Sequence, residues 1–142
     1  MPLLRKIRTF RRLRAADRLL VAEAAVCLGV ARALVLTVRF GRLTPWLSRA
    51  PESAGFDADL ARRVCGAVTI AARNVPWKAV CLPQAMAAKF MLGRRGCGSS
   101  FHLGAGFDQQ REMFAHAWLE SGGKIVIGDG GMAGITPLAK FG

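Results

Sequence analysis

The uneven distribution of glycine constrains this sequence more than any other feature. Of the 16 glycines in 142 residues, 12 lie from Gly93 onward. The residues before Gly93 are compatible with helices, whereas the glycine-rich remainder is typical of strands joined by turns. Helices followed by a sheet predict an α+β fold. A length of 142 residues suits one domain, so we expect a single domain over 1–142, with a basic helical region over 1–49 and a core over 50–142.

Stop and start signals divide the chain into elements. Asp57 is a good N-cap, Pro76 must end the helix that Asp57 begins, and Pro83 suits a first helical turn. Gly41 and Pro45 are expected to break the first helix. Helices are therefore predicted over 16–38, 57–75 and 82–96, with a short helical turn at 46–49. Strands are predicted over 99–107, 113–121 and 124–129.

The net charge of +12 is concentrated at one end of the chain. Residues 1–18 hold seven Arg or Lys and one Asp, which is +6, whereas residues 99–142 hold three basic and four acidic residues, which is −1. A basic chain suggests an anionic partner such as nucleic acid. However, the predicted sheet is slightly acidic and the chain has no tyrosine for stacking on bases. We therefore expect no nucleic-acid partner, and we keep a basic accessory protein that binds nucleic acid as an alternative.

The stretch 19–38 is close to a membrane span in length and apolarity. It contains Glu23 and Arg32, and a central charge costs about 2.5–3.5 kcal/mol on insertion scales, so a buried or interfacial helix is favoured over a span. The lead-in places Leu3, Ile7 and Phe10 among arginines, a pattern compatible with peripheral membrane contact or with a solvated basic face. A non-catalytic, membrane-associated protein is thus a second alternative.

The cysteines point to one reactive thiol. None of the four forms a CxxC pair and no cleavable signal precedes them, so we expect reduced thiols in a cytoplasmic protein and no metal site. Cys81 stands at a predicted helix start, where free backbone N–H groups favour a thiolate and can hold an oxyanion. The others are expected to be structural; they are Cys27, Cys65 and Cys97.

A cysteine nucleophile needs a base, and His102 and His116 are the two histidines. His116 lies on an alternating strand, sharing a face with Phe114, Trp118 and Glu120. A two-residue turn at 122–123 would pair Trp118 with Ile127 and His116 with Asp129. The carboxylate would then orient the imidazole. His102 has no directly opposed acid in this register, so a structural role is predicted for it.

Several segments carry a family resemblance. They are VPWKAVCLPQA at 75–85, LGRRG at 92–96, LGAG at 103–106, AHAWLE at 115–120 and the helical start at 16–24. Together they resemble the stand-alone leader peptidase of lasso-peptide biosynthesis, a transglutaminase-like, papain-like cysteine protease. The resemblance implies a triad carried onto Cys81, His116 and Asp129, and cleavage of a ribosomally made precursor between leader and core.

The resemblance also implies partners. Family members act with a leader-recognition protein and an ATP-dependent macrolactam synthetase. We expect the recognition protein to be separate, since the chain is too short to contain it, and we expect ATP to serve the synthetase while this chain uses no cofactor. The Cys81 backbone N–H, with Trp77 or Gln84, is predicted to hold the oxyanion, although Trp77 fits a core role equally well. The basic N-terminal face is interpreted as a docking surface for these partners.

Overall fold

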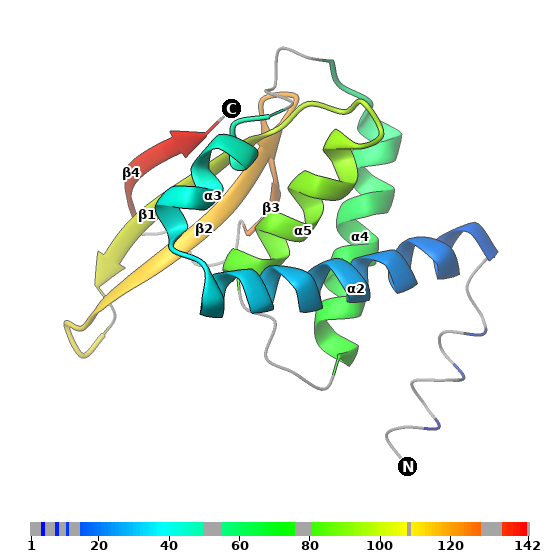
Figure 1. The fold of residues 1–142 in the computed structure, drawn as a ribbon, viewed down its shortest axis with the longest axis horizontal. Helices are drawn as coiled ribbons and strands as arrows, with labels where there is room; N and C mark the ends of the chain where they lie inside the picture. Colours follow the sequence, from blue (N-terminus) through cyan, green and yellow to red (C-terminus); the bar gives the residue numbers. More distant parts are fainter. Residues whose placement is uncertain are drawn as a thin grey trace.

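The computed structural model describes residues 4, 8, 11, 15–49, 55–75, 81–107, 109–128 and 135–141. The helices are α2 (Ala15–Thr37), α3 (Phe40–Leu47), α4 (Ala58–Asn74) and α5 (Cys81–Gly93). The strands that follow are β1 (Ser100–Phe107), β2 (Met113–Ser121), β3 (Lys124–Ile127) and β4 (Thr136–Phe141). Helices followed by an antiparallel sheet confirm the predicted α+β fold (Figure 1).

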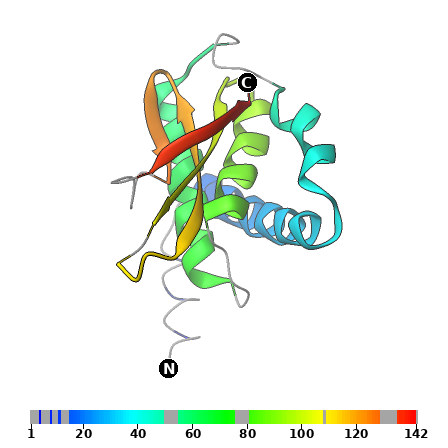
Figure 2. The same ribbon diagram turned by 90° about the vertical axis from the view of Figure 1, so that its left-hand side faces the viewer.

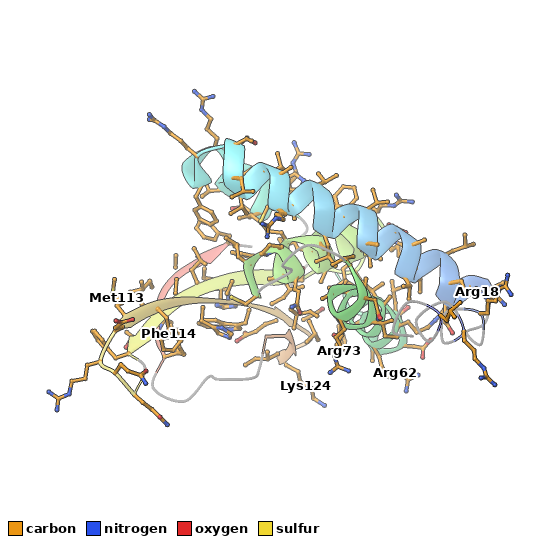
Figure 3. The ribbon with its side chains drawn as sticks, turned by 90° about the horizontal axis from the view of Figure 1, so that it is seen from below. Arg18, Arg62, Arg73, Met113, Phe114 and Lys124 are labelled. Atoms are coloured by element: carbon orange, nitrogen blue, oxygen red, sulfur yellow. The ribbon has the colours of Figure 1, made fainter. Side chains whose placement is uncertain are left out.

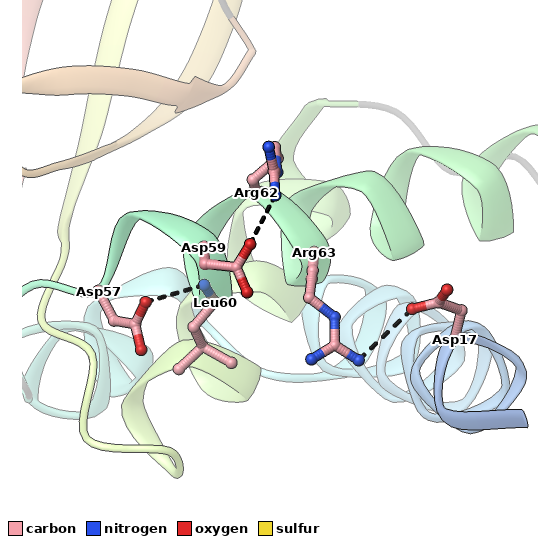
Figure 4. A network of polar contacts seen from close by, with 6 residues as sticks. All are labelled: Asp17, Asp57, Asp59, Leu60, Arg62 and Arg63. Atoms are coloured by element: carbon pink, nitrogen blue, oxygen red, sulfur yellow. Dashed lines mark hydrogen bonds and ion pairs between the residues drawn. The ribbon is translucent and has the colours of Figure 1, made fainter. Parts of the chain in front are cut away.

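Local signals determine where α4 and α5 begin and end. The Asp57 carboxylate accepts a hydrogen bond of 3.1 Å from the Leu60 backbone N–H, as an N-cap should (Figure 4). At the other end of α4, Val75 is extended, as the residue before a proline tends to be. α5 ends at Gly93, and the Cys97 N–H returns to the Leu92 carbonyl at 3.0 Å. The bounds of α4 agree with the predicted 57–75 and α5 begins within one residue of the predicted 82, but α5 ends at Gly93 because residues 94–96 form a turn instead of a last helical turn.

The start of α3 differs from the prediction. Gly41 and Pro45 were expected to end the first helix and precede a helical turn at 46–49; the first helix does end, at Thr37, but both residues lie inside α3. Pro45 has no N–H to offer the carbonyl of Gly41, four residues earlier. The Thr44 hydroxyl donates to that carbonyl instead, at 2.9 Å. A side-chain hydrogen bond therefore replaces the missing backbone one, and the helix starts six residues earlier than predicted.

α2 packs across α4 and α5 (Figure 1). Its buried residues form one stripe: Leu20, Val21, Ala24, Leu28 and Ala31. Ion pairs of Asp17 with Arg63 and of Glu23 with Arg94 and Arg95 join it to its neighbours. Arg63 of α4 lies 3.5 Å from Asp17 (Figure 4), and Arg95, just after α5, holds Glu23 with both guanidinium arms at 2.9 and 2.5 Å. The stripe and the ion pairs fix which face of α2 points inward.

α5 lies at the centre of the molecule. It contacts α2 and α4 on one side and β1, β2 and β3 on the other. Eight of its thirteen residues are buried, which is the expectation for a helix covered on both sides. Figure 2 shows the helices on one face of the sheet. α5 is therefore packed between the other helices and the strands.

The sheet has the order β3-β2-β1-β4. β4 was not predicted, and it pairs antiparallel with β1 along one edge of the sheet. Most of its residues are exposed, and its second residue is Pro137. Such a strand lacks the alternating apolar pattern that marks a half-buried strand, and proline is tolerated at an edge. Pairing with β1 therefore defines it.

The register of the β2–β3 hairpin corrects a prediction. Gly122 and Gly123 form the expected two-residue turn, both with positive φ, and Ser121 pairs with Lys124. Glu120 still pairs with Ile125, as this turn requires. The register then shifts by one residue, so that Leu119 pairs with Ile127 and not with Val126. Val126 is the extra residue of a β-bulge. The predicted pairing of Trp118 with Ile127 is therefore wrong by one residue.

Candidate active site

Cys81 is the first residue of α5 and is half-buried against the core. The first four N–H groups of a helix have no partner within it, and Pro83 in the first turn has no N–H to leave unsatisfied. The thiol thus sits where the helix dipole and backbone donors stabilise negative charge. This is the environment predicted for it.

The other cysteines are poor nucleophiles. Burial, followed by the effect of Cys97, raises the pKa of the Cys65 thiol to about 12. Burial also raises the pKa of the Cys27 thiol, with Glu23 adding to the effect. Cys97 is 1% exposed, and its Sγ lies 3.8 Å from the Ser121 hydroxyl. The structure therefore leaves Cys81 as the thiol best placed to react.

His116 is half-buried on β2, and one of its ring nitrogens has a defined partner. Nε2 lies 2.6 Å from the carbonyl oxygen of Gly128. A carbonyl can only accept, so Nε2 must carry the hydrogen and donate it. In the neutral ring, Nδ1 then holds the lone pair. His116 is thereby fixed in the tautomer that accepts a proton at Nδ1.

Gly128 is required at the position that orients His116. Its φ is +83°, a conformation that other residues rarely adopt. A Cβ built on it would lie 2.7 Å from the Ala117 carbonyl oxygen and 3.2 Å from the Trp118 Cα. Backbone therefore approaches backbone closely here. The Gly128 backbone packs directly against the β2 backbone, and this close contact places the Gly128 carbonyl within hydrogen-bond distance of the His116 ring.

His102 occupies a different environment on the same face. Its ring stacks on Trp118 at 5.2 Å with an interplanar angle of 8°, and Nε2 lies 3.2 Å from the Ser100 hydroxyl and 3.4 Å from a Glu120 oxygen. Glu120 also accepts from the Trp118 indole N–H at 3.2 Å. Glu120 lies diagonally across from His102, because the residue directly opposite His102 is Trp118. A search restricted to directly opposed pairs therefore misses this acid. This buried network favours a structural role.

The elements that carry Cys81 and His116 are adjacent. α5 packs against β2, and both views of the ribbon show the first turn of α5 close to that strand (Figures 1 and 2). Among the described residues, no hydrogen bond joins the Cys81 thiol to the His116 ring. Gln84 is half-buried in the first turn of α5.

Two predicted site residues, Trp77 and Asp129, lie outside the described residues. The pairing of Asp129 with His116 rested on the register that the bulge at Val126 overturns. In the described part of the chain, the Gly128 carbonyl is the group that meets Nε2 of His116. Within that same part, no group of three His, Cys, Asp or Glu residues is placed to hold a metal ion.

The layout has the features of one class of protein. A central helix that begins with cysteine and packs against a histidine-bearing strand is the arrangement of papain-like, α+β cysteine enzymes. The sequence model of the transglutaminase-like superfamily matches residues 24–140, so the chain belongs to the transglutaminase-like superfamily. Cysteine proteases are common in this superfamily. No curated protein and no solved structure matches the chain.

Proposed function

We propose that the protein is a cysteine peptidase that removes the leader from a ribosomally made lasso-peptide precursor. Hydrolysis would free the core amine for macrolactam closure. The observation that supports the peptidase assignment is the placement of Cys81 at the start of α5, next to the strand that carries His116, whose Nε2 bonds to the Gly128 carbonyl and leaves Nδ1 for proton transfer. The lasso-precursor assignment rests on the resemblance of segments 75–85 and 115–120.

In the proposed mechanism, Nδ1 of His116 takes the thiol proton and Cys81 Sγ attacks the carbonyl of the last leader residue. His116 returns the proton to the departing core amine, leaving a thioester on Cys81. A water then loses a proton to His116 and attacks the thioester, which releases the leader as an acid and restores the thiol. The Cys81 backbone N–H would hold the oxyanion together with Trp77 or Gln84.

Asp129 is proposed as the third member of the triad on the resemblance alone. The Gly128 carbonyl fixes the tautomer of His116, but its dipole offsets only part of the charge on an imidazolium. A carboxylate supplies a full opposing charge and stabilises that ion more strongly. In this proposal the Gly128 carbonyl orients the His116 ring, and the Asp129 carboxylate stabilises the charge of the imidazolium.

The proposed partners follow from the reaction. A separate leader-recognition protein would present the precursor, and a macrolactam synthetase would use ATP to close the ring on the freed amine. The peptidase itself would need no cofactor, since thiol, imidazole and water suffice for hydrolysis. We propose that all of these proteins act in the cytoplasm.

The test is cleavage of the precursor in the presence of the recognition protein, followed by mass spectrometry. Cys81→Ala should abolish release of the leader, and circular dichroism should show an unchanged fold because the residue is only half-buried. Cys27→Ala is the matched control, a half-buried thiol on α2 whose pKa is raised by burial. Full cleavage by Cys81→Ala would refute the assignment.

A further inference from the structure

None of the exposed residues of α2 is charged, and its two arginines, Arg18 and Arg32, are half-buried. Its exposed residues are all apolar or uncharged: Ala15, Ala16, Leu19, Ala22, Val26, Val30, Ala33, Val35, Leu36 and Thr37. Three of the largest are strongly exposed, Leu19 at 73%, Val26 at 66% and Leu36 at 71%. A surface helix normally places polar residues outward. α2 therefore presents apolar surface on both of its faces.

The acidic groups of α2 are neutralised within the protein. Asp17 meets Arg63, and Glu23 meets Arg94 and Arg95. The hydrogen bond from Arg95 lowers the pKa of the Glu23 carboxyl, against the opposing effect of burial. These ion pairs hold the inner face of α2 to the rest of the fold. They leave the outward face free of carboxylates.

A groove continues this apolar surface between α2, α3 and α5. Its volume is about 270 Å³, and its walls include Val26 and Val30 of α2 together with Trp46 and Phe90. Trp46 and Phe90 stack with their ring centroids 6.1 Å apart. The groove adjoins the exposed face because Val26 and Val30 belong to both. Together they form one apolar surface that spans three helices.

Cations surround this surface. A second hollow of about 230 Å³ shares Trp46 and Phe90 with the groove and is lined by the exposed Arg49 and Arg94. Lys89 also lines it, but Lys89 is only 3% exposed and its ammonium donates inward to the Ser99 carbonyl at 2.6 Å, so it is not one of the surrounding cations. Other cations flank the two ends of α2: Arg18, labelled in Figure 3, and the exposed Arg39 and Arg42. An apolar face bordered by cations is complementary to an anionic amphiphilic surface.

We propose that this surface docks the protein on a bilayer that contains anionic lipid. α2 lies in the plane of the interface, its outward face enters the boundary of the acyl chains, and the flanking arginines contact lipid phosphates. By length and composition α2 could also cross a membrane, with a mean hydropathy of 2.2 over its most apolar window. Its inner face is occupied by α4 and α5, so it lies on the membrane rather than through it.

This docking leaves the sheet away from the lipid. Figure 3 shows α2 along one side of the molecule and the strands along the other, with Arg62 and Arg73 of α4 directed away from α2. A peptide can then reach β2 while α2 is bound to the membrane. The inference does not rest on the proposed peptidase activity.

Vesicle flotation of the purified full chain tests the proposal. It should bind vesicles of phosphatidylcholine mixed with phosphatidylglycerol, and bind phosphatidylcholine alone more weakly. Val26→Glu with Val30→Glu should weaken binding by about tenfold or more, because charge enters the apolar boundary. The matched control is Met113→Glu with Leu138→Glu, two residues that are 73% and 69% exposed on the sheet. This control should bind like wild type.

A second pair of variants tests the cations. Arg39→Glu with Arg42→Glu should weaken binding to the anionic vesicles by about tenfold or more, since each basic group near the surface contributes measurably. Arg62→Glu with Arg73→Glu makes the same charge change on the other side of the molecule and should have little effect. Cys81→Ala should float like wild type, which separates docking from catalysis.

Three results would overturn the proposal. The first is failure of the wild-type chain to bind either kind of vesicle. The second is equal loss of binding in test and control pairs. The third is a dimer detected by light scattering that Val26→Glu with Val30→Glu dissociates, without any vesicle binding; that result would assign the face to a second copy of the chain.

Discussion

The surroundings of His102 and His116 differ although both rings stack on Trp118. The centroid of the Trp118 ring lies 5.2 Å from that of His102 and 6.0 Å from that of His116. His102 is buried and shares a network with Ser100 and Glu120. His116 is half-buried, and among the described residues the one hydrogen bond of its ring goes from Nε2 to the Gly128 carbonyl.

The difference separates a structural histidine from a candidate base. A ring in a buried network of hydroxyl and carboxylate contributes to stability, and moving its proton disturbs several partners. A ring held at one nitrogen by a backbone carbonyl is oriented but keeps its other nitrogen for proton transfer. The position of a histidine on a strand is therefore less informative than the chemistry of its partners.

The largest effect should come from replacing the two histidines in turn. His116→Ala should lower the kcat/KM for peptide hydrolysis by about 1,000-fold, within the usual range for loss of a general base. His102→Ala should instead lower the free energy of unfolding by about 2 kcal/mol, because it leaves the Glu120 carboxylate with one partner fewer. Urea denaturation and steady-state kinetics on both variants measure this. Equal losses of kcat/KM in folded His116→Ala and folded His102→Ala would contradict the assignment of different roles to the two histidines.

The next effect concerns the charge on the imidazolium. Asp129→Asn should lower kcat/KM by about 100-fold, since an amide cannot stabilise imidazolium as a carboxylate does. The same kinetic assay measures it, with Asp108→Asn as a control for the loss of one negative charge elsewhere. A rate close to that of wild type would show that the Gly128 carbonyl is sufficient for His116.

A smaller effect is expected from the peptide that orients His116. Gly128→Ala adds a Cβ that would lie 2.7 Å from the Ala117 carbonyl oxygen, so the loop must shift and carry its carbonyl away from Nε2. We expect about a tenfold loss of kcat/KM, because small misplacements of catalytic groups are costly. Gly123→Ala is the control: its φ is +78°, yet a Cβ there meets nothing within 4 Å. It should lose stability without losing activity.

The smallest effect on catalysis is expected from the Glu23–Arg95 pair, far from both histidines in the sequence. Glu23→Gln should lower the free energy of unfolding by about 2 kcal/mol at neutral pH and leave kcat/KM unchanged. The pKa of Glu23 is lowered in the folded state, mainly by the hydrogen bond from Arg95. Its contribution is therefore present above the ordinary pKa of 4.5 and is lost as the pH falls through the folded value.

Denaturation curves of wild type and Glu23→Gln at several pH values check this sign. The difference in stability between them should shrink as the solution is acidified below pH 4.5. A difference that grows on acidification would contradict it. An unchanged kcat/KM in Glu23→Gln would also show that a loss of about 2 kcal/mol in the free energy of unfolding does not by itself lower catalysis. The loss of kcat/KM expected for His116→Ala would then be an effect on the reaction.

Much of the fold could be predicted from the sequence because its signals are local. Asp57 caps α4 through its own side chain, and Pro76 excludes a helical conformation at Val75. β4 gave no such signal, since it is mostly exposed and contains Pro137. Its existence depends on pairing with β1, a contact distant in the chain. The early start of α3 was missed because the hydrogen bond from the Thr44 hydroxyl compensates for Pro45.

In the candidate site, too, the features with local sequence signals were predicted and those that depend on distant contacts were not. The helix start at Cys81 and the strand at His116 were predicted from neighbouring residues. The third partner of the site was predicted from hairpin register, and one extra residue at Val126 shifted that register. Neither the bulge nor the diagonal contact of Glu120 with His102 has a local sequence signal. Both depend on how whole strands pack.

The most direct test of the account is the rate at which iodoacetamide alkylates Cys81 at neutral pH, located by peptide mass spectrometry. In the wild-type protein and in His102→Ala, Cys81 should be alkylated faster than Cys27 and Cys65, whose pKa values are raised by burial. In His116→Ala, alkylation of Cys81 should be at least about tenfold slower, because the group that takes the thiol proton is gone. An unchanged rate in His116→Ala would contradict the central claim that His116 activates Cys81.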